Sequence, residues 1–156
     1  MADVFDKAKR SQVMASITAK DTKPEILVRK ALHRKGYRYR LHDRALPGTP
    51  DLIFRKFNAV IMVNGCFWHG HDCALFRMPA TNRKFWSDKI SNNQERDRRV
   101  RADLLDLGWR VLIVWECSLK GKRRTRFDDL IATVESWLLS DQNELELSAA
   151  YFGLHD

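Results

Sequence analysis

The 156-residue sequence fits one globular domain, because 44% of its residues are hydrophobic and a chain of this length supports a single core. Lys and Arg total 28 against 20 Asp and Glu, and the resulting net charge of +8 favours a polyanionic partner such as nucleic acid. No apolar run reaches the roughly 18 residues of a membrane span, and the N-terminus lacks the apolar core of a signal peptide. We therefore expect a soluble, cytoplasmic protein with no membrane partner.

The hydrophobic spacing predicts helices and strands between two polar ends. Residues 1–20 are polar and basic, so we expect an arm that a partner must order. Thr22-Lys-Pro-Glu25 resembles a helix start, and amphipathic spacing continues to Gly36. The segment from Ser140 onward is polar, and we assign it no fixed structure. Strands are predicted at 37–41, 51–54, 59–63 and 109–116, and further helices at 83–107 and 127–139.

This order of elements predicts an α/β sandwich in which helices cover a mixed sheet. No glycine-rich phosphate loop follows a first strand, which argues against a dinucleotide-binding fold.

The ten-residue stretch NGCFWHGHDC contains two cysteines, two histidines and two adjacent aromatic residues. The chain has three cysteines, an odd number, so metal ligation in a reducing compartment explains them better than disulfides. If the strand before Cys117 pairs beside the strand before this stretch, all three cysteines and one histidine can form a closed tetrahedral zinc site. The alternative is that the cysteines are small buried hydrophobic residues. The predicted ligands are Cys66, His71, Cys73 and Cys117.

Three further residues are candidates for chemistry. His69 is left over from the four-ligand count, and its imidazole suits either a general base or an alternative zinc ligand. Asp51 begins a predicted buried strand, where a carboxylate could hold Mg²⁺ on a rigid frame, although a Pro-Asp pair is more often a turn. Glu25, on the first helix, is a second acidic candidate.

Five groups of residues resemble one family in order and spacing over about residues 5–120: RSQVMASI with DTKPE, LPGTPD, NGCFWHGHDC, KFWSDKISNNQERDRR and LGWRVLIVWEC. The family is the very-short-patch-repair endonucleases, bacterial enzymes that nick DNA beside a T:G mismatch left by deamination of 5-methylcytosine. The resemblance implies a restriction-endonuclease-like three-layer sandwich with a mixed central sheet and a structural zinc site. It also implies a DNA-binding arm at 1–20, a nuclease domain at 21–140 and a tail at 141–156.

The resemblance implies a role for each candidate residue. Asp51 and the backbone carbonyl of Val63 would bind catalytic Mg²⁺, His69 would activate water as the general base, and Glu25 would support the water around the metal. The family pattern has threonine and histidine where this chain has Val63 and Asn64, and an amide at position 64 cannot titrate near neutral pH. The acidic-x-lysine end of many restriction nuclease sites is absent, so His69 must replace the lysine.

The resemblance also implies insertion into the DNA beside the mismatch. A T:G wobble pair is already displaced, so unstacking the adjoining step costs less there than at a Watson-Crick pair. Phe67 and Trp68 could equally be core residues, and Trp86 could belong to the core of its helix. The implied inserting residues are Phe67, Trp68 and Trp86 from the major groove, and Met14 and Ile17 from the minor groove.

Basic residues without matching acidic runs fit contacts with DNA phosphates, although each run alone is a common feature of solvated surface. They cluster at 29–40, 96–101 and 120–126. Lys89 and Asn93 lie four apart on one helix face near Trp86, and we expect them to touch bases or backbone near the mismatch.

The leading hypothesis is a Mg²⁺-dependent, strand-specific endonuclease that nicks double-stranded DNA at T:G mismatches and so initiates very short patch repair. We expect a monomer that can meet mismatch-repair proteins. One alternative is a zinc-stabilised DNA-binding module without catalysis, and the other is a related nuclease that cuts paired DNA.

Overall fold

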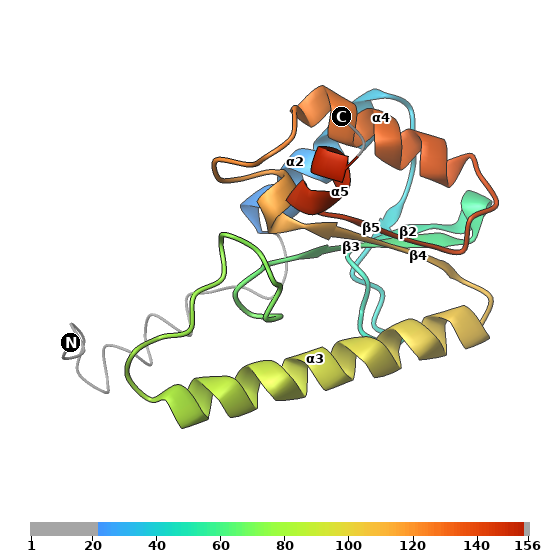
Figure 1. The fold of residues 1–156 in the computed structure, drawn as a ribbon. Coiled ribbons are helices and arrows are strands. Elements are labelled where there is room, and N and C mark those ends of the chain that lie inside the picture. Colours follow the sequence, from blue (N-terminus) through green and yellow to red (C-terminus); the bar gives the residue numbers. More distant parts are fainter. Residues whose placement is uncertain (1–21, 155–156) are drawn as a thin grey trace.

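A five-stranded mixed sheet runs through the centre of the protein, whose computed structural model describes residues 22–154 (Figure 1). The first three strands pair antiparallel, whereas the third, fourth and fifth pair parallel. The mixed sheet confirms the α/β architecture indicated by the order of predicted elements. The strands lie across the sheet in chain order: β1 (Arg40–Leu41), β2 (Leu52–Phe54), β3 (Ala59–Asn64), β4 (Arg110–Trp115) and β5 (Glu144–Leu147).

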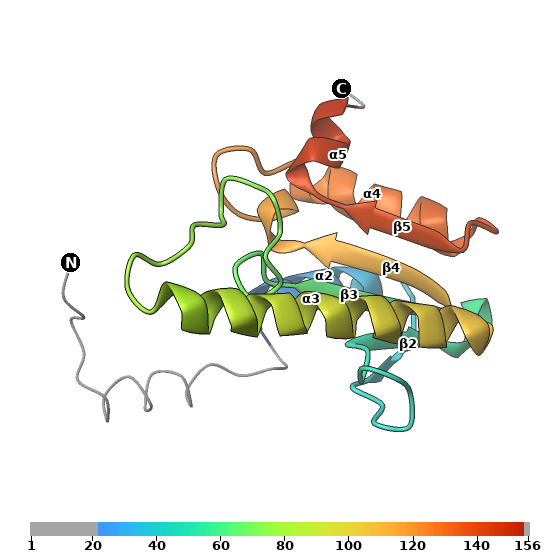
Figure 2. The same cartoon turned by 60° about the horizontal axis from the view of Figure 1, so that its bottom comes forward.

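Helices cover both faces of this sheet. The long helix α3 (Arg83–Asp106) crosses one face alone, and α2 (Lys23–Arg34), α4 (Phe127–Leu138) and α5 (Ala149–Leu154) lie on the other (Figures 1 and 2). The layers are therefore helix, sheet and helix. Within residues 22–154, no helix is both long and apolar enough to cross a membrane.

Each layer of helices has its own core, because side chains alternate between the two faces along a strand. On the α3 side, Leu104 packs with Ile53, Val60, Val111 and Ile113. With both faces covered, the central strands are apolar at nearly every position, which explains the continuous runs read as buried strands. The core on the other side includes Leu52, Phe54, Ala59, Ile61, Leu112 and Val114 of the sheet and Leu32, Leu130, Val134 and Trp137 of the helices.

The crossover through α3 brings together two segments that are far apart in the sequence. β3 and β4 are parallel neighbours, and their register ends with Asn64 beside Trp115. The loop after β3 and the short 3₁₀ helix after β4 (Glu116–Ser118) therefore emerge at the same edge of the sheet. This is the juxtaposition on which the predicted zinc site depended.

The predicted strand at 37–41 is wrong in length, because only Arg40–Leu41 pair with β2. The two tyrosines before it are used for packing. The Tyr37 and Tyr39 rings contact Phe54, and the Tyr39 hydroxyl donates a hydrogen bond to the carbonyl of Arg29 at 2.7 Å.

The expectation of no fixed structure after Ser140 is also wrong. Residues 144–147 form β5, the parallel edge strand beside β4, and α5 follows it. Leu147 is fully buried, while Glu144 and Glu146 are exposed. The sequence ELEL therefore has the alternation of a half-buried strand, which a reading of overall polarity misses.

Candidate active site and metal centre

Three cysteines and a histidine meet where β3 and β4 end. Their ligand atoms all lie within 4.8 Å of one another. Cys66 lies two residues after the end of β3, and Cys117 lies in the 3₁₀ helix after β4, so the predicted approach of these two segments is confirmed. The group comprises Cys66, His71, Cys73 and Cys117.

Hydrogen bonds from the backbone stabilise negative charge on two of the sulfur atoms. The N–H of Cys117 donates to Cys66 Sγ at 3.3 Å, and the N–H of Ala149 donates to Cys117 Sγ at 3.4 Å. The pKa of Cys117 falls to about 5, chiefly through the hydrogen bond from the Cys66 thiol. That shared proton and burial raise the pKa of Cys66. Cys117 therefore ionises first, and the thiolate is the form that binds metals.

The donor set fits a structural metal site. Thiolate and imidazole suit a borderline-soft ion held tetrahedrally, and four protein donors leave no open position. The N–H of His71 donates to the carbonyl of Cys66 at 2.9 Å, which closes the loop between them. The His71 ring stacks on Trp115 with centroids 4.2 Å apart and 14° between the planes.

A second group joins the predicted acids Glu25 and Asp51 to a histidine. Val63 donates its N–H to Asp51 Oδ2 at 2.8 Å. Glu25 is only 1% exposed, and its carboxylate lies 2.8 Å from Arg29 Nη1. His42 Nε2 is 3.0 and 3.1 Å from the two carboxylate oxygens of Glu25 and 3.8 Å from Asp51 Oδ1.

Sequence reasoning selected Glu25 and Asp51 but missed His42. This histidine follows the two-residue strand β1 and has a left-handed backbone with φ of 49°. Neither feature leaves a pattern in the sequence that would have identified His42 as part of the site. Only the tertiary structure places it between the two carboxylates.

Burial changes the acidity of Asp51. Desolvation and, to a lesser extent, the neighbouring Glu25 raise the pKa of its carboxyl to about 7, against the opposing effects of the hydrogen bond from Val63 and the charge of Arg29. The Asp51 carboxyl is therefore poorly solvated and lies close to the carboxylate of Glu25. A cation beside it would favour the ionised form.

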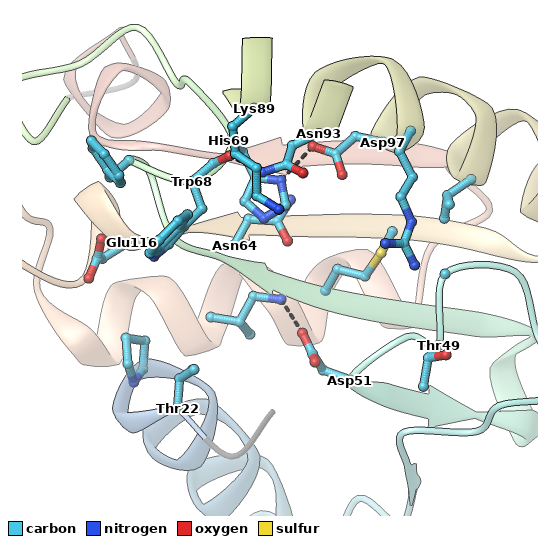
Figure 3. A pocket seen from close by; sticks show the side chains of 18 residues that line it. Thr22, Thr49, Asp51, Asn64, Trp68, His69, Lys89, Asn93, Asp97 and Glu116 are labelled. Carbon is cyan, nitrogen blue, oxygen red and sulfur yellow. Dashed lines mark hydrogen bonds and ion pairs between the residues drawn. The ribbon is translucent and has the colours of Figure 1, made fainter. Parts of the chain in front are cut away.

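His69 is separate from the cysteine group and faces the cleft. Its Nδ1 lies 2.5 Å from Oδ2 of Asp97, which α3 supplies (Figure 3). Sequence reasoning missed Asp97, because it stands within the charged run ERDRR and reads as part of a solvated helix face. This geometry favours the interpretation of His69 as a cleft residue over that of an alternative metal ligand.

Asp51 and the His69–Asp97 pair border one cleft of about 760 Å³. Figure 3 shows Asp51 on one side and the His69–Asp97 pair on the other, with β3 between them. Val63 and Asn64 also line the cleft. So does Glu116, which sequence reasoning did not select. The other residues around it include Thr22, Thr49, Phe67, Trp68, Lys89, Asn93 and Arg96.

The predicted inserting rings form one cluster beside the cleft. The centroid of Phe67 is 5.2 Å from that of Trp68 and 5.4 Å from that of Trp86, and the two tryptophans are 5.8 Å apart. All three are half-buried, so they are neither fully in the core nor fully presented to solvent. Met14 and Ile17 lie outside the described residues.

Side chains of α3 hold the loop that carries these rings. Asn93 Nδ2 donates to the carbonyl of Trp68 at 2.9 Å, and Gln94 Nε2 donates to the carbonyl of Gly70 at 3.2 Å. Gly70 has φ of +59°, and a Cβ there would lie 2.5 Å from atoms of Ile90 and Gln94. The loop therefore needs glycine at this close approach.

Comparison with known proteins identifies the class. The family model described as DNA mismatch endonuclease Vsr matches residues 2–75. The DNA mismatch endonuclease Vsr of Escherichia coli (strain K12) is 43% identical over 155 residues, covering 99% of this chain and 98% of that protein. The type II nicking enzyme V.NmeAIP of Neisseria meningitidis serogroup A is 43% identical over 137 residues, covering 86% and 98%. The type II nicking enzyme V.XorIIP of Xanthomonas oryzae pv. oryzae is 45% identical over 119 residues, covering 76% and 88%.

These similarities define the chain as a DNA endonuclease. It belongs to the Vsr family of DNA mismatch endonucleases, which confirms the resemblance recognised in its sequence motifs.

Proposed function

We propose that this endonuclease is a Mg²⁺-dependent nickase that cuts one strand of double-stranded DNA beside a T:G mismatch from deaminated 5-methylcytosine. Nicking there would initiate very short patch repair. The observation that carries the proposal is that Asp51 and the His69–Asp97 pair border one cleft, next to three clustered aromatic rings. The layered mixed sheet is consistent with a restriction-endonuclease-like fold.

Asp51 and Val63 would supply the protein ligands for the catalytic ion. The N–H of Val63 points to Asp51, and in a strand the N–H and carbonyl of one residue point to the same edge. The Val63 carbonyl therefore faces the same edge as Asp51, where β2 has not yet begun. Bound Mg²⁺ would stabilise negative charge on the phosphate undergoing cleavage. A valine can serve because the ligand is its backbone.

His69 would be the general base, with Asp97 as its positioning residue. If the Nδ1–H donates to Asp97, Nε2 carries the lone pair and can accept a proton from water. Glu25 would support the metal site, since its carboxylate is buried close to Asp51 and held by Arg29. Asn64 lines the cleft, where its amide can orient a phosphate but cannot titrate near neutral pH.

The cysteine group would hold structural Zn²⁺ and make its loop a rigid mount. Phe67 and Trp68 lie on this loop and contact Trp86 of α3, so their insertion beside a mismatch would start from one preformed cluster. Stacking on the inserted rings offsets part of the cost of unstacking the DNA. The arm at 1–20, with Met14 and Ile17, would approach from the minor groove.

Positive side chains beside the cleft suit a DNA backbone. Lys89 and Arg96 line it from α3, on the same side as His69. We also propose that residues 21–140, together with β5 and α5 that follow them, form the nuclease domain, that the protein acts as a monomer in the cytoplasm, and that mismatch-repair proteins follow it to the nick.

The test is nicking of end-labelled duplexes in Mg²⁺, comparing T:G with C:G at one position across several methylation-site contexts. We expect cleavage of the T strand only, lost in Asp51→Ala and retained in Asp106→Ala, a matched control on the exposed end of α3. Cutting of C:G duplexes as fast as T:G duplexes would show that the protein is the related nuclease that cuts paired DNA. Mismatch binding without cleavage in any context would show a DNA-binding module and overturn the proposal.

A further inference from the structure

The group around Asp51 contains a nitrogen donor, on His42, that the proposed Mg²⁺ chemistry does not use. Donor atoms of Glu25, His42 and Asp51 all lie within 4.8 Å of one another, so these residues could hold one ion. They come from α2, from the turn after β1 and from the start of β2. The Glu25 and His42 side chains are 1% and 12% exposed, which separates this group from acidic residues scattered on a surface.

The distances within the group match the edges of a metal coordination polyhedron. Neighbouring ligands at about 2.1 Å from an octahedral ion are about 3.0 Å apart. His42 Nε2 is 3.0 Å from Glu25 Oε2 and 3.8 Å from Asp51 Oδ1. An ion could therefore reach all three donors after small shifts of the side chains.

The surrounding contacts hold the donors in place. Arg29 binds Glu25 at 2.8 Å, and the N–H of Val63 binds the Asp51 oxygen that faces away from His42. Such contacts orient metal ligands before the ion arrives. When both are ionised, the carboxylates of Glu25 and Asp51 outnumber the one guanidinium of Arg29, and a divalent cation would offset the remaining negative charge.

The mixture of donors determines which ion fits. Mg²⁺ prefers oxygen ligands and keeps several waters, whereas first-row transition metals accept imidazole together with carboxylate. Mn²⁺ suits both donor types and the near-octahedral spacing. We propose that Glu25, His42 and Asp51 form a mixed nitrogen and oxygen site that binds Mn²⁺ in preference to Mg²⁺, with His42 Nε2 as a direct ligand. The inference rests on the proposed metal-dependent nuclease and gives its metal site a third side chain and a preferred ion.

The alternative is that His42 only bridges the two carboxylates by hydrogen bonds. In that case the imidazole would be a positioning group, and no nitrogen would contact the ion.

Metal-binding measurements on the full-length, zinc-loaded protein without DNA distinguish direct coordination by His42 from hydrogen bonding alone. Free Mn²⁺ is measured by electron paramagnetic resonance, and Mg²⁺ by competition with bound Mn²⁺. We expect one Mn²⁺ at this site, bound at least about tenfold more tightly than Mg²⁺. His42→Gln should weaken Mn²⁺ binding by about tenfold or more and change Mg²⁺ binding less than about threefold. His33→Gln, the same change at an exposed position of α2, should bind both ions like the parent protein.

Electron spin echo modulation gives a second readout, and its first measurement, on the parent protein, does not depend on a variant folding correctly. Coordinated imidazole should produce nitrogen modulation from Mn²⁺ bound to the parent protein and to His69→Gln, and His42→Gln should lack it. Absence of modulation in the parent protein, or its survival in His42→Gln, would overturn the inference. If the protein gives one of these two contrary results but nicks T:G duplexes in Mg²⁺, the inference about His42 fails and the proposed function stands. If the protein binds Mn²⁺ through His42 but never cuts DNA, the metal site stands and the proposed function fails.

Discussion

Asp97 Oδ2 lies 2.5 Å from Nδ1 of His69, although 28 residues separate them in the sequence. This contact joins α3 to the loop after β3, which carries Cys66, His71 and Cys73, and it lies at the wall of the cleft. A carboxylate at Nδ1 fixes the tautomer of the ring and leaves Nε2 for the substrate side. Two further bonds from Asn93 and Gln94 support the same loop.

Replacing Asp97 by asparagine should impair the chemical step more than DNA binding. An asparagine amide can donate to Nδ1, which moves the ring proton to Nε2 and removes the acceptor that a general base needs. We expect kcat for T:G nicking to fall by about 10²-fold with little change in KM. Single-turnover nicking and mismatch binding measure the two effects. Glu95→Gln on the exposed part of α3 is the matched control, and equal losses in both variants would contradict a positioning role for Asp97.

The sequence predicted most of the fold because strong local patterns decided it. WRVLIVWE and the 83–107 periodicity predicted β4 and α3 to within two residues at each end. The cysteine spacing, together with the assumption that the strand before Cys117 pairs near the strand at 59–63, led to the four members of the metal group. His42, Asp97 and Glu116 could not be predicted from periodicity, because their partners are distant in sequence.

Without Mg²⁺, the stability of the protein should depend on pH through Asp51. Its folded pKa is about 7, above the unfolded value of about 3.9, so the folded state holds more protons between these values. The free energy of unfolding should therefore fall as pH rises from about 4 to about 7.

Asp51→Asn removes this titration and keeps an oxygen that can accept from Val63. We expect the variant to be more stable than the parent protein by about 2 kcal/mol at pH 8 and to show a much smaller difference at pH 4.5. Urea unfolding with the zinc retained and Mg²⁺ omitted measures both. A difference between the two proteins that does not change with pH would contradict the role of Asp51, and Asp106→Asn controls for charge alone.

Asn93 tests whether α3 reads DNA or holds the loop. Its amide already donates to the Trp68 carbonyl at 2.9 Å, so removal should loosen the mount of the aromatic cluster. We expect Asn93→Ala to lower the T:G nicking rate and the preference for T:G over C:G together, each by about 3- to 10-fold. Loss of discrimination at an unchanged rate would instead support the predicted direct contact with DNA. Asn92→Ala, exposed on the same helix, should leave both unchanged.

The chain after Ser140 should be part of the folded nuclease. The sequence resemblance had instead implied a nuclease domain at 21–140 and a separate tail at 141–156. Leu147 is fully buried against the core, and the N–H of Ala149 donates to Cys117 Sγ. Leu147→Ala should lower the free energy of unfolding by about 2 to 4 kcal/mol, whereas Glu144→Ala at an exposed position of the same strand should cost far less.

Truncation after Ser140 extends this test to the metal centre. It removes β5 from the edge of β4 and the hydrogen bond to the Cys117 thiolate, so zinc should leave the truncated chain faster. Release into a chromogenic chelator measures this rate, and thermal unfolding of the same samples measures the lost core. A truncated chain that retains both its zinc and its melting temperature would show that residues 141–156 are an appendage.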